Sequence, residues 1–235
     1  MNLLAIDTSC SILCAAVSRD DELFTEEIEG AMKQSEYIMV CIDKIMNKAS
    51  LKPADLNGVL CMKGPGSFTG LRIGYSIAKG LALSLSIPFA SISTLDCVVH
   101  GLSEKPLQNN PHIDTALSII NASKNAFFYV IYNIMHNEAH NEFPFVKRLT
   151  QDKDGNIIKI IEEIKNYKNK LIITGPGTTL IKESLPQDIK DMCIINDEYR
   201  GYAKELIAIA KKTKILDNDN TEYLFSGPEY NRLPG

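Results

Sequence analysis

The chain has 235 residues, of which 45% are hydrophobic and 23% are charged, and its net charge is −4. A chain of this length and composition is an ordinary globular protein with one large domain or two small ones. The acidic balance argues against a self-sufficient nucleic-acid binder, which usually has a basic face, while an RNA site shared with a partner stays open.

The cysteines and the first residues indicate the compartment. Six cysteines are spread along the chain without any CxxC pair. Cys10, Cys14, Cys41 and Cys61 lie in apolar surroundings, as buried reduced thiols do, which indicates a reducing compartment. The start MNLLAIDTSC lacks a basic segment, and its apolar stretch is too short for a signal peptide. No run reaches membrane-spanning length, so we expect a cytosolic protein without membrane contact.

The first half of the chain predicts a β-β-β-α-β-α order. Short polar turns join the first three strands, which suggests an antiparallel meander, and apolar residues at helical spacing follow. The expected elements are strands at Leu3–Ile6, Ile12–Ser18 and Leu23–Ile28, a helix at Gln34–Lys48, a strand at Val59–Met62, a helix at Leu71–Leu85, a strand at Pro88–Ile92 and a helix at Thr94–Leu102.

The second half predicts a repeat of this plan. Residues Ser103 to His112 are rich in proline and asparagine, which marks a domain boundary. The elements expected beyond it are strands at Thr115–Ile120, Phe127–Ile134, Glu142–Leu149, Leu171–Thr174 and Met192–Ile195, and helices at Ile157–Tyr167 and Gly201–Lys212. We therefore predict an N-terminal domain over residues 1–102, a degenerate second copy over residues 113–213 and a tail over residues 214–235.

A glycine-rich turn, Gly64-Pro65-Gly66-Ser67-Phe68-Thr69-Gly70, joins the fourth strand to its helix. Ser67 and Thr69 could cap that helix, and such a loop favours a phosphate or carboxylate ligand. The common nucleotide motifs do not fit, because the Walker lysine is missing and Thr69 replaces the third glycine of the dinucleotide fingerprint. A similar turn, Gly175-Pro176-Gly177-Thr178-Thr179, comes later. Duplication explains the pair, and two coincidental Gly-Pro turns are the alternative.

The helix at Leu71–Leu85 carries apolar side chains around most of its circumference, more than one core-facing stripe requires. Small residues also recur at i,i+4 spacing, which lets a partner helix approach closely. One row is Gly70, Gly74, Ala78 and Ala82, and the other is Ser76, Gly80 and Ser84. These rows either pack inside the domain or form an interface with another chain, and the sequence leaves both interpretations open.

Asp7 ends the first strand and would face the glycine loop if both belong to one sheet. It could hold a metal–phosphate complex, as in duplicated actin-like ATPases and sugar kinases, or cap the turn through the N–H groups of Thr8 and Ser9. No lysine or second acid stands nearby in the sequence, so capping is the preferred interpretation.

The histidines do not predict a metal or catalytic site. His136 and His140 form HNEAH, which would place two ligands on one face of a helix. The segment lies between two strand-like runs, however, and in a hairpin loop residues at this spacing do not converge. His100 and His112 are isolated, and no Ser-His-Asp or Cys-His set is supported, so no catalytic residue is predicted.

The stretch Lys63-Gly64-Pro65-Gly66-Ser67-Phe68-Thr69-Gly70-Leu71-Arg72-Ile73-Gly74 closely resembles the TsaB (YeaZ) family, the bacterial partner of TsaD in making threonylcarbamoyladenosine on tRNA. Four further anchors support the resemblance: LLAIDTS near the start, Lys79-Gly80-Leu81-Ala82, Ser93-Thr94-Leu95, and Pro228-Glu229-Tyr230-Asn231-Arg232, which is similar to the family's terminal P-x-Y-x-R. Together the anchors span nearly the whole chain.

The resemblance implies an α/β fold of the actin-like ATPase (ASKHA, ribonuclease-H-like) class with two duplicated subdomains. It also implies that two helices of the first subdomain pack against the equivalent helices of TsaD, or of a second copy when TsaD is absent. The interface residues would be Ile38, Cys41, Ile42, Ile45, Arg72, Ile73, Gly74, Ile77, Ala78, Gly80 and Leu81. The residues of a vestigial nucleotide site would be Asp7, Thr8, Ser9, Gly175 and Gly177.

In the family that the sequence resembles, TsaD performs the transfer and holds the metal through a His-x-x-x-His on its first long helix. The equivalent helix here opens Lys33-Gln34-Ser35-Glu36, without histidine. We therefore expect a non-catalytic subunit, without cofactor or metal, that activates threonylcarbamoyl transfer to an adenosine of tRNAs reading codons that start with A. It would form a heterodimer with TsaD, join TsaE in a larger complex and meet tRNA only through that complex.

Three alternatives to the subunit role stay open. The chain could be an independent actin-like ATPase or kinase, a glycoprotease-like peptidase, or an RNA-binding module. The sequence also departs from the family at Asn121-Ala122-Ser123-Lys124-Asn125-Ala126, where the family often has Asp-Ala-Arg followed by an acidic residue. A ligand or RNA contact made there by the family's Asp or Arg is not carried over.

Overall fold

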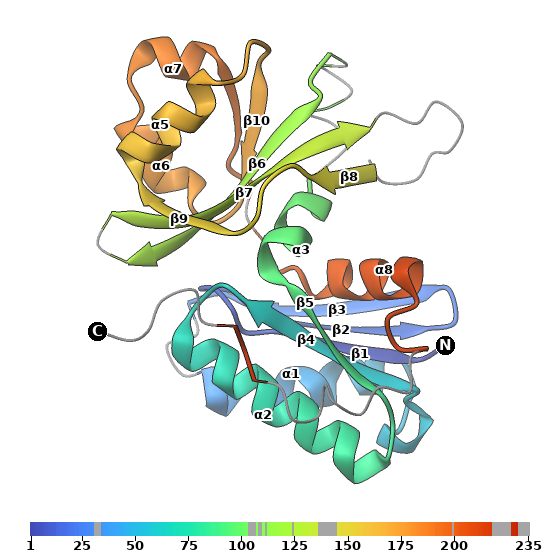
Figure 1. Cartoon of the computed structure of the whole chain (residues 1–235). Helices are drawn as coiled ribbons and strands as arrows, with labels where there is room; N and C mark the ends of the chain where they lie inside the picture. Colours follow the sequence, from blue (N-terminus) through green and yellow to red (C-terminus); the bar gives the residue numbers. More distant parts are fainter. Residues whose placement is uncertain are drawn as a thin grey trace. The chain divides into compact units, whose positions relative to one another are not determined.

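The computed structural model describes residues 1–30, 34–102, 107, 110, 112–123, 125–135, 145–198, 200–217 and 227–229. The chain divides into two compact units, one made of Met1–Cys97 with Arg200–Gly235 and the other of Val98–Tyr199. Figure 1 shows the elements of each unit along the chain. In the described part of the chain, no helix combines the length and apolar character that crossing a bilayer would need.

The first unit is built on a five-stranded sheet with the order β3-β2-β1-β4-β5. Its strands are β1 (Leu3–Asp7), β2 (Leu13–Arg19), β3 (Glu22–Ile28), β4 (Gly58–Gly64) and β5 (Phe89–Ser93). The first three run antiparallel, which confirms the predicted meander, and β4 and β5 continue the sheet in parallel.

Helices cover both faces of this sheet. Every residue of β1 is buried, so neither face is open to water. Helices α1 (Gln34–Lys48) and α2 (Phe68–Leu85) lie on one face, and α8 (Ala203–Thr213) lies on the other (Figure 1). A short 3-10 helix, Pro53–Asp55, precedes β4, and α3 (Thr94–His100) follows β5.

Helix α2 begins three residues before the predicted start because Ser67 caps it. The Ser67 hydroxyl oxygen accepts a hydrogen bond from the N–H of Gly70 at 3.2 Å. This bond satisfies one of the N–H groups that a helix start leaves without a partner, so the first turn already forms at Phe68. The predicted capping role of Ser67 is thus confirmed, whereas Thr69 lies inside the helix.

The second unit repeats the strand plan of the first. Its strands are β6 (Thr115–Ser123), β7 (Ala126–Met135), β8 (Phe145–Arg148), β9 (Lys153–Asn156), β10 (Leu171–Thr174) and β11 (Cys193–Asn196). β6, β7 and β8 run antiparallel, and β10 and β11 continue in parallel beyond β6. Strand β9, which pairs with β7, was not predicted. The helices are α5 (Ile157–Lys165), α6 (Thr178–Ser184) and α7 (Gln187–Asp191).

The C-terminal boundary of the second unit differs from the boundary of the predicted second domain. Residues 201–212 were predicted as part of the second domain, but α8 belongs to the first unit. Leu206, Ile207 and Ala210 are buried, and α8 packs against β1 and β2. The physical reason is that the face of the sheet opposite α1 and α2 is apolar as well and needs a helix to cover it.

Candidate functional site

The glycine loop between β4 and α2 packs against the turn that follows β1. The N–H of Ser67 donates to the carbonyl oxygen of Ser9 at 2.7 Å. A Cβ atom on Gly66 would lie 2.5 Å from that carbonyl oxygen. A side chain does not fit at this position, so the close approach of two segments of this chain explains the glycine without a phosphate ligand.

Asp7 is fully buried at the end of β1, and groups of this chain contact both of its carboxylate oxygens. Oδ1 accepts from the N–H of Ser9 at 3.0 Å and from its hydroxyl at 2.7 Å. Oδ2 accepts from the N–H of Tyr202 at 3.0 Å. Burial raises the pKa of Asp7, and the bonds from Ser9 and Tyr202 act in the opposite direction. The carboxylate thus holds the turn after β1 and the segment that leads into α8.

The second glycine turn is packed in a similar way within the second unit. The N–H of Gly177 donates to the carbonyl oxygen of Ile119 at 3.1 Å, and a Cβ atom there would lie 2.9 Å from Cγ1 of Ile119. The hydroxyl of Thr178 donates to the carbonyl oxygen of Gly175 at 2.7 Å. The five residues of the predicted nucleotide site are therefore split, with Gly175 and Gly177 in one unit and Asp7, Thr8 and Ser9 in the other.

The structure corrects the predicted partner residues of α1. Ile38, Cys41, Ile42 and Ile45 are buried in the core of the first unit, with at most 6% of each side chain exposed. They face the sheet because the apolar stripe of α1 covers β2 and β3. The exposed apolar side chains of α1 are Tyr37, Met39 and Val40, which are 44%, 49% and 47% exposed.

The two small-residue rows of α2 have different surroundings. The first row, Gly70, Gly74, Ala78 and Ala82, is buried and packs inside the unit. Gly74 and Ala78, which were predicted as interface residues, are therefore core residues instead. The other row, Ser76, Gly80 and Ser84, is exposed. A Cβ atom on Gly80 would meet no atom within 4 Å. The interpretation of internal packing is therefore correct for the first row, and the second row is open to solvent, where an interface with another chain stays a prediction.

The exposed row of α2 lies among apolar residues. Ile73, Ile77 and Leu81 are half-buried at the edge of the core, and Leu83 is 59% exposed. Helices α1 and α2 lie side by side on one face of the sheet. We call their outer apolar residues the helix-pair surface; it consists of Tyr37, Met39, Val40, Ile73, Ile77, Gly80, Leu81 and Leu83.

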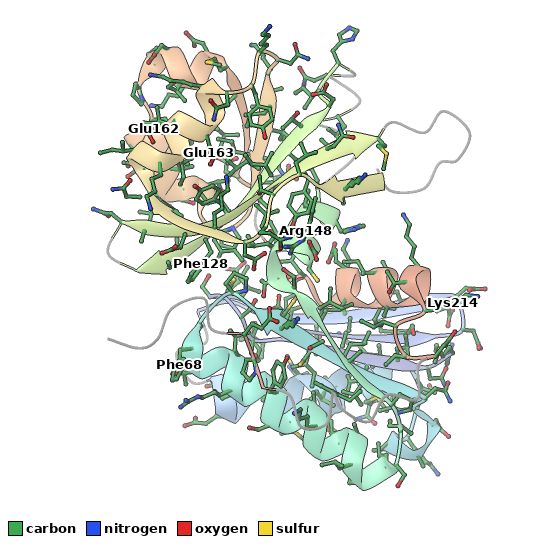
Figure 2. The ribbon with its side chains drawn as sticks, in the orientation of Figure 1. Phe68, Phe128, Arg148, Glu162, Glu163 and Lys214 are labelled. Atoms are coloured by element: carbon green, nitrogen blue, oxygen red, sulfur yellow. The ribbon has the colours of Figure 1, made fainter. Side chains whose placement is uncertain are left out.

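A cation–aromatic contact lies at the first turn of α2. The guanidinium carbon of Arg72 stands 3.8 Å from the centroid of the Phe68 ring. Phe68 is the first residue of the helix, where Figure 2 labels it, and Arg72 is exposed one turn later. The predicted interface residue Arg72 thus lies near the end of α2 that adjoins the glycine loop, with its guanidinium in cation–π contact with the ring.

Sequence reasoning missed Glu205 in the first turn of α8. Its side chain is 2% exposed, and Oε1 accepts from Arg200 at 3.1 Å. The buried Oε2 has no hydrogen-bond partner among the residues that the structure describes. Burial raises the pKa of Glu205 from 4.5 to about 7, against the opposing effects of Lys204 and Arg200. The sequence did contain a signal for this residue: an acidic side chain stands between Ala203 and Leu206, in the apolar stripe of a predicted helix, where a buried position is expected.

The predicted histidines and the altered segment at residues 121–126 give little further evidence for a functional site. His136 and His140 lie outside the described residues, and so does Lys124 of the altered segment. Asn121, at the end of β6, donates from its side chain to the carbonyl oxygen of Pro176 at 3.4 Å. Within the described ranges, no group of three or more His, Cys, Asp or Glu side chains is placed to hold a metal ion.

Comparisons with known proteins find relatives of this chain. The model of a family described as "TsaD: tRNA N6-adenosine threonylcarbamoyltransferase" matches residues 29–229. A protein of Bacillus subtilis (strain 168), named tRNA threonylcarbamoyladenosine biosynthesis protein TsaB, is 29% identical over 187 residues, covering 79% of this chain and 75% of that protein. Its namesake in Buchnera aphidicola subsp. Schizaphis graminum (strain Sg) is 32% identical over 217 residues, covering 91% and 97%.

A solved structure extends the comparison to the fold. YeaZ from Pseudomonas aeruginosa superposes with a TM-score of 0.70 at 16% identity, covering 91% of this chain and 92% of that one. The two mixed sheets with their helices therefore form the predicted actin-like, ASKHA-type α/β fold. The sequence matches and the shared fold show that this chain belongs to the TsaB (YeaZ) family, within the wider group that the TsaD family model describes.

Proposed function

We propose that this protein is a non-catalytic subunit of the machinery that makes threonylcarbamoyladenosine on tRNA, and that it binds a TsaD-type partner through the helix-pair surface. The observation that carries the proposal is that α1 and α2, besides the apolar side chains that they turn toward the sheet, expose four large apolar side chains on two neighbouring helices: Tyr37, Met39, Val40 and Leu83. Exposed apolar side chains also occur singly elsewhere, which is normal for a protein surface: Met1, Leu23, Leu149, Ile158 and Leu180.

The helix-pair surface has the properties of a helix-packing site. A helix that only covers a core needs one apolar stripe, and α2 satisfies this with its buried row. On its outer side, the open position at Gly80 allows a second helix to approach closely between Ile77 and Leu83. Apolar area covered there contributes about 25 cal/mol per Å² before the costs of association.

The family relationship supports the choice of partner. Because the TsaD family model matches this chain, a TsaD-type protein is expected to carry two equivalent helices on its own first unit. Packing of like on like then gives a pseudo-symmetric heterodimer, and two copies of this chain pair in the same way when TsaD is absent. In this proposal TsaE joins the heterodimer, tRNA is met only through the complex, and the complex acts in the cytoplasm.

The contacts of Asp7 support an accessory role over an ATPase role. An acid that holds a metal–phosphate complex must be accessible to it, whereas Asp7 is fully buried and both of its oxygens accept hydrogen bonds from Ser9 and Tyr202. Gly66 of the first turn is explained by packing against Ser9, and Gly175 and Gly177 of the second turn by packing against Ile119. We infer that these residues are remnants of a nucleotide site that now have structural roles.

A reconstituted modification assay tests the proposal. TsaD and TsaE are combined with tRNA and the activated threonylcarbamoyl donor, with and without this chain, and the modified nucleoside is measured. We expect modification only when the chain is present, and co-purification of the chain with TsaD. Equal modification without the chain, or turnover of a substrate by the chain alone, would contradict the accessory role.

A further inference from the structure

We propose that the segment 227–229 of this chain acts as a latch, in which Glu229 binds the end of β4 and positions the glycine loop and the first turn of α2. Glu229 belongs to the terminal Pro-Glu-Tyr-Asn-Arg pattern, to which the proposed function gives no role. Of the tail, the structure describes residues 214–217 and 227–229, and Glu229 lies in the second of these segments.

Two contacts join Glu229 to Lys63, the last residue of β4 before Gly64. The N–H of Glu229 donates to the carbonyl oxygen of Lys63 at 2.9 Å. The Lys63 ammonium lies 2.6 Å from Oε1 of Glu229. One residue of the tail is therefore held to one residue of the strand through both its main chain and its side chain.

Gly64 provides the space that the tail occupies. Its φ is +112°, which side chains rarely adopt, and a Cβ atom there would lie 2.5 Å from the carbonyl oxygen of Glu229. The same Cβ atom would lie 3.2 Å from Cδ1 of Leu71 in the first turn of α2. The Glu229 carbonyl and the Leu71 side chain thus both adjoin Gly64, so displacement of Glu229 opens space beside the residue that leads from β4 into the glycine loop.

The latch is expected to open without unfolding of the unit. The side chains of Lys63 and Glu229 are 40% and 56% exposed, and an ion pair with that exposure contributes little and is weakened by salt. Such segments open locally far more often than the whole unit unfolds. The first turn of α2 carries Phe68, whose ring contacts Arg72 one turn later. An open latch would therefore change the end of α2 that adjoins the glycine loop; this last step rests on the proposed function.

Charge reversal in the full-length chain tests the latch. We compare Lys63→Glu, Glu229→Lys and the double variant, and measure hydrogen exchange of the Glu229 amide and of the amides of residues 67–71. Each single variant is expected to exchange about two- to fivefold faster at low salt, since like charges then face each other. The double variant is expected to return to the wild-type rate, because the pair is restored with its signs exchanged.

A matched control separates the latch from a general effect of charge. Lys182 and Asp197 form an ion pair of similar length, 2.7 Å, and similar exposure, 56% and 49%, in the second unit. Lys182→Glu is expected to leave the exchange of Glu229 unchanged. The latch is overturned if the single variants exchange at the wild-type rate, or if the double variant remains as fast as the single ones.

A second readout distinguishes the latch from the proposed function. The dissociation constant for TsaD is measured for the same variants, and weaker binding of the single variants with recovery in the double variant supports the latch. If the wild type does not bind TsaD while the exchange rates follow the expected pattern, the latch stands and the proposed function fails. Weaker binding of the single variants without faster exchange would overturn the latch and assign Lys63 and Glu229 to direct partner contact.

Discussion

Gly74 of α2 lies directly against Thr8, the residue that follows β1. A Cβ atom on Gly74 would come within 2.5 Å of the Thr8 hydroxyl oxygen. That hydroxyl donates to the carbonyl oxygen of Gly70 at 2.7 Å, one turn earlier in the same helix. The buried row of small residues is therefore a close contact between α2 and the end of β1, while Gly80 lies on the open side.

This contact predicts opposite results for two glycines of one helix. Gly74→Leu is expected to lower the free energy of unfolding by at least about 1–3 kcal/mol, because the side chain cannot fit against Thr8. Gly80→Leu is expected to leave it unchanged or raise it by up to about 1 kcal/mol, because an exposed glycine inside a helix is unfavourable. Urea denaturation of both variants measures the difference, and equal stabilities would contradict the assignment of the two rows.

Glu205 predicts a pH dependence of stability. Its pKa in the folded chain is about 7, against an ordinary 4.5, so between these values the folded state binds more protons than the unfolded state. The free energy of unfolding contributed by this group therefore falls as the pH rises from about 4.5 to 7. Glu205→Gln, which cannot ionise, is expected to remove this fall, worth up to about 3 kcal/mol.

Denaturation at pH 4.5 and at pH 8 checks this expectation. The stability of Glu205→Gln relative to the wild type should be greater at pH 8 than at pH 4.5. Glu183→Gln serves as the control, because it makes the same substitution at an exposed position of α6 in the second unit. Parallel pH profiles for the wild type and Glu205→Gln would show that Glu205 ionises in the fold as it does in water.

Substitution of Asp7 is expected to lower the stability of the fold. If the chain were an ATPase, the same substitution would instead abolish nucleotide binding or turnover. In Asp7→Asn an amide NH₂ would face one of the donors, Ser9 or Tyr202, which leaves hydrogen-bonding groups unpaired in a buried place. The expected loss of stability is about 1–3 kcal/mol. Calorimetry with Mg-ATP is expected to give no tight binding to the isolated wild type. Tight binding that disappears in Asp7→Asn would favour the ATPase alternative.

The sequence allowed the local structure to be predicted well, because helical spacing, strand alternation and glycine turns are local signals. The capping of α2 by Ser67 and the meander of β1 to β3 are examples. Spacing also grouped Ile38, Cys41 and Ile45 on one side of α1. It could not show that this side faces the sheet, because a shared face does not reveal what covers it.

The structure differs from the sequence-based prediction where residues far apart in the sequence are in contact. Asp7 and Tyr202 are 195 positions apart, and their hydrogen bond lies where the chain returns to the first unit after the second. The contact of Glu229 with Lys63 is of the same kind. Neither of these two contacts produces a periodic pattern in the sequence. The prediction therefore placed α8 in the second domain instead of the first, and it gave the tail no contact with the rest of the chain.

The affinity of surface variants for TsaD tests the central claim most directly. The dissociation constant is measured for the wild type, Val40→Glu and Leu83→Glu on the helix-pair surface, and Ile158→Glu, whose residue is 60% exposed on α5 of the second unit. We predict that the two helix-pair variants bind at least about tenfold more weakly, as expected when a charge is placed in an apolar contact, and that Ile158→Glu binds like the wild type. Equal affinities for all four proteins would contradict the account.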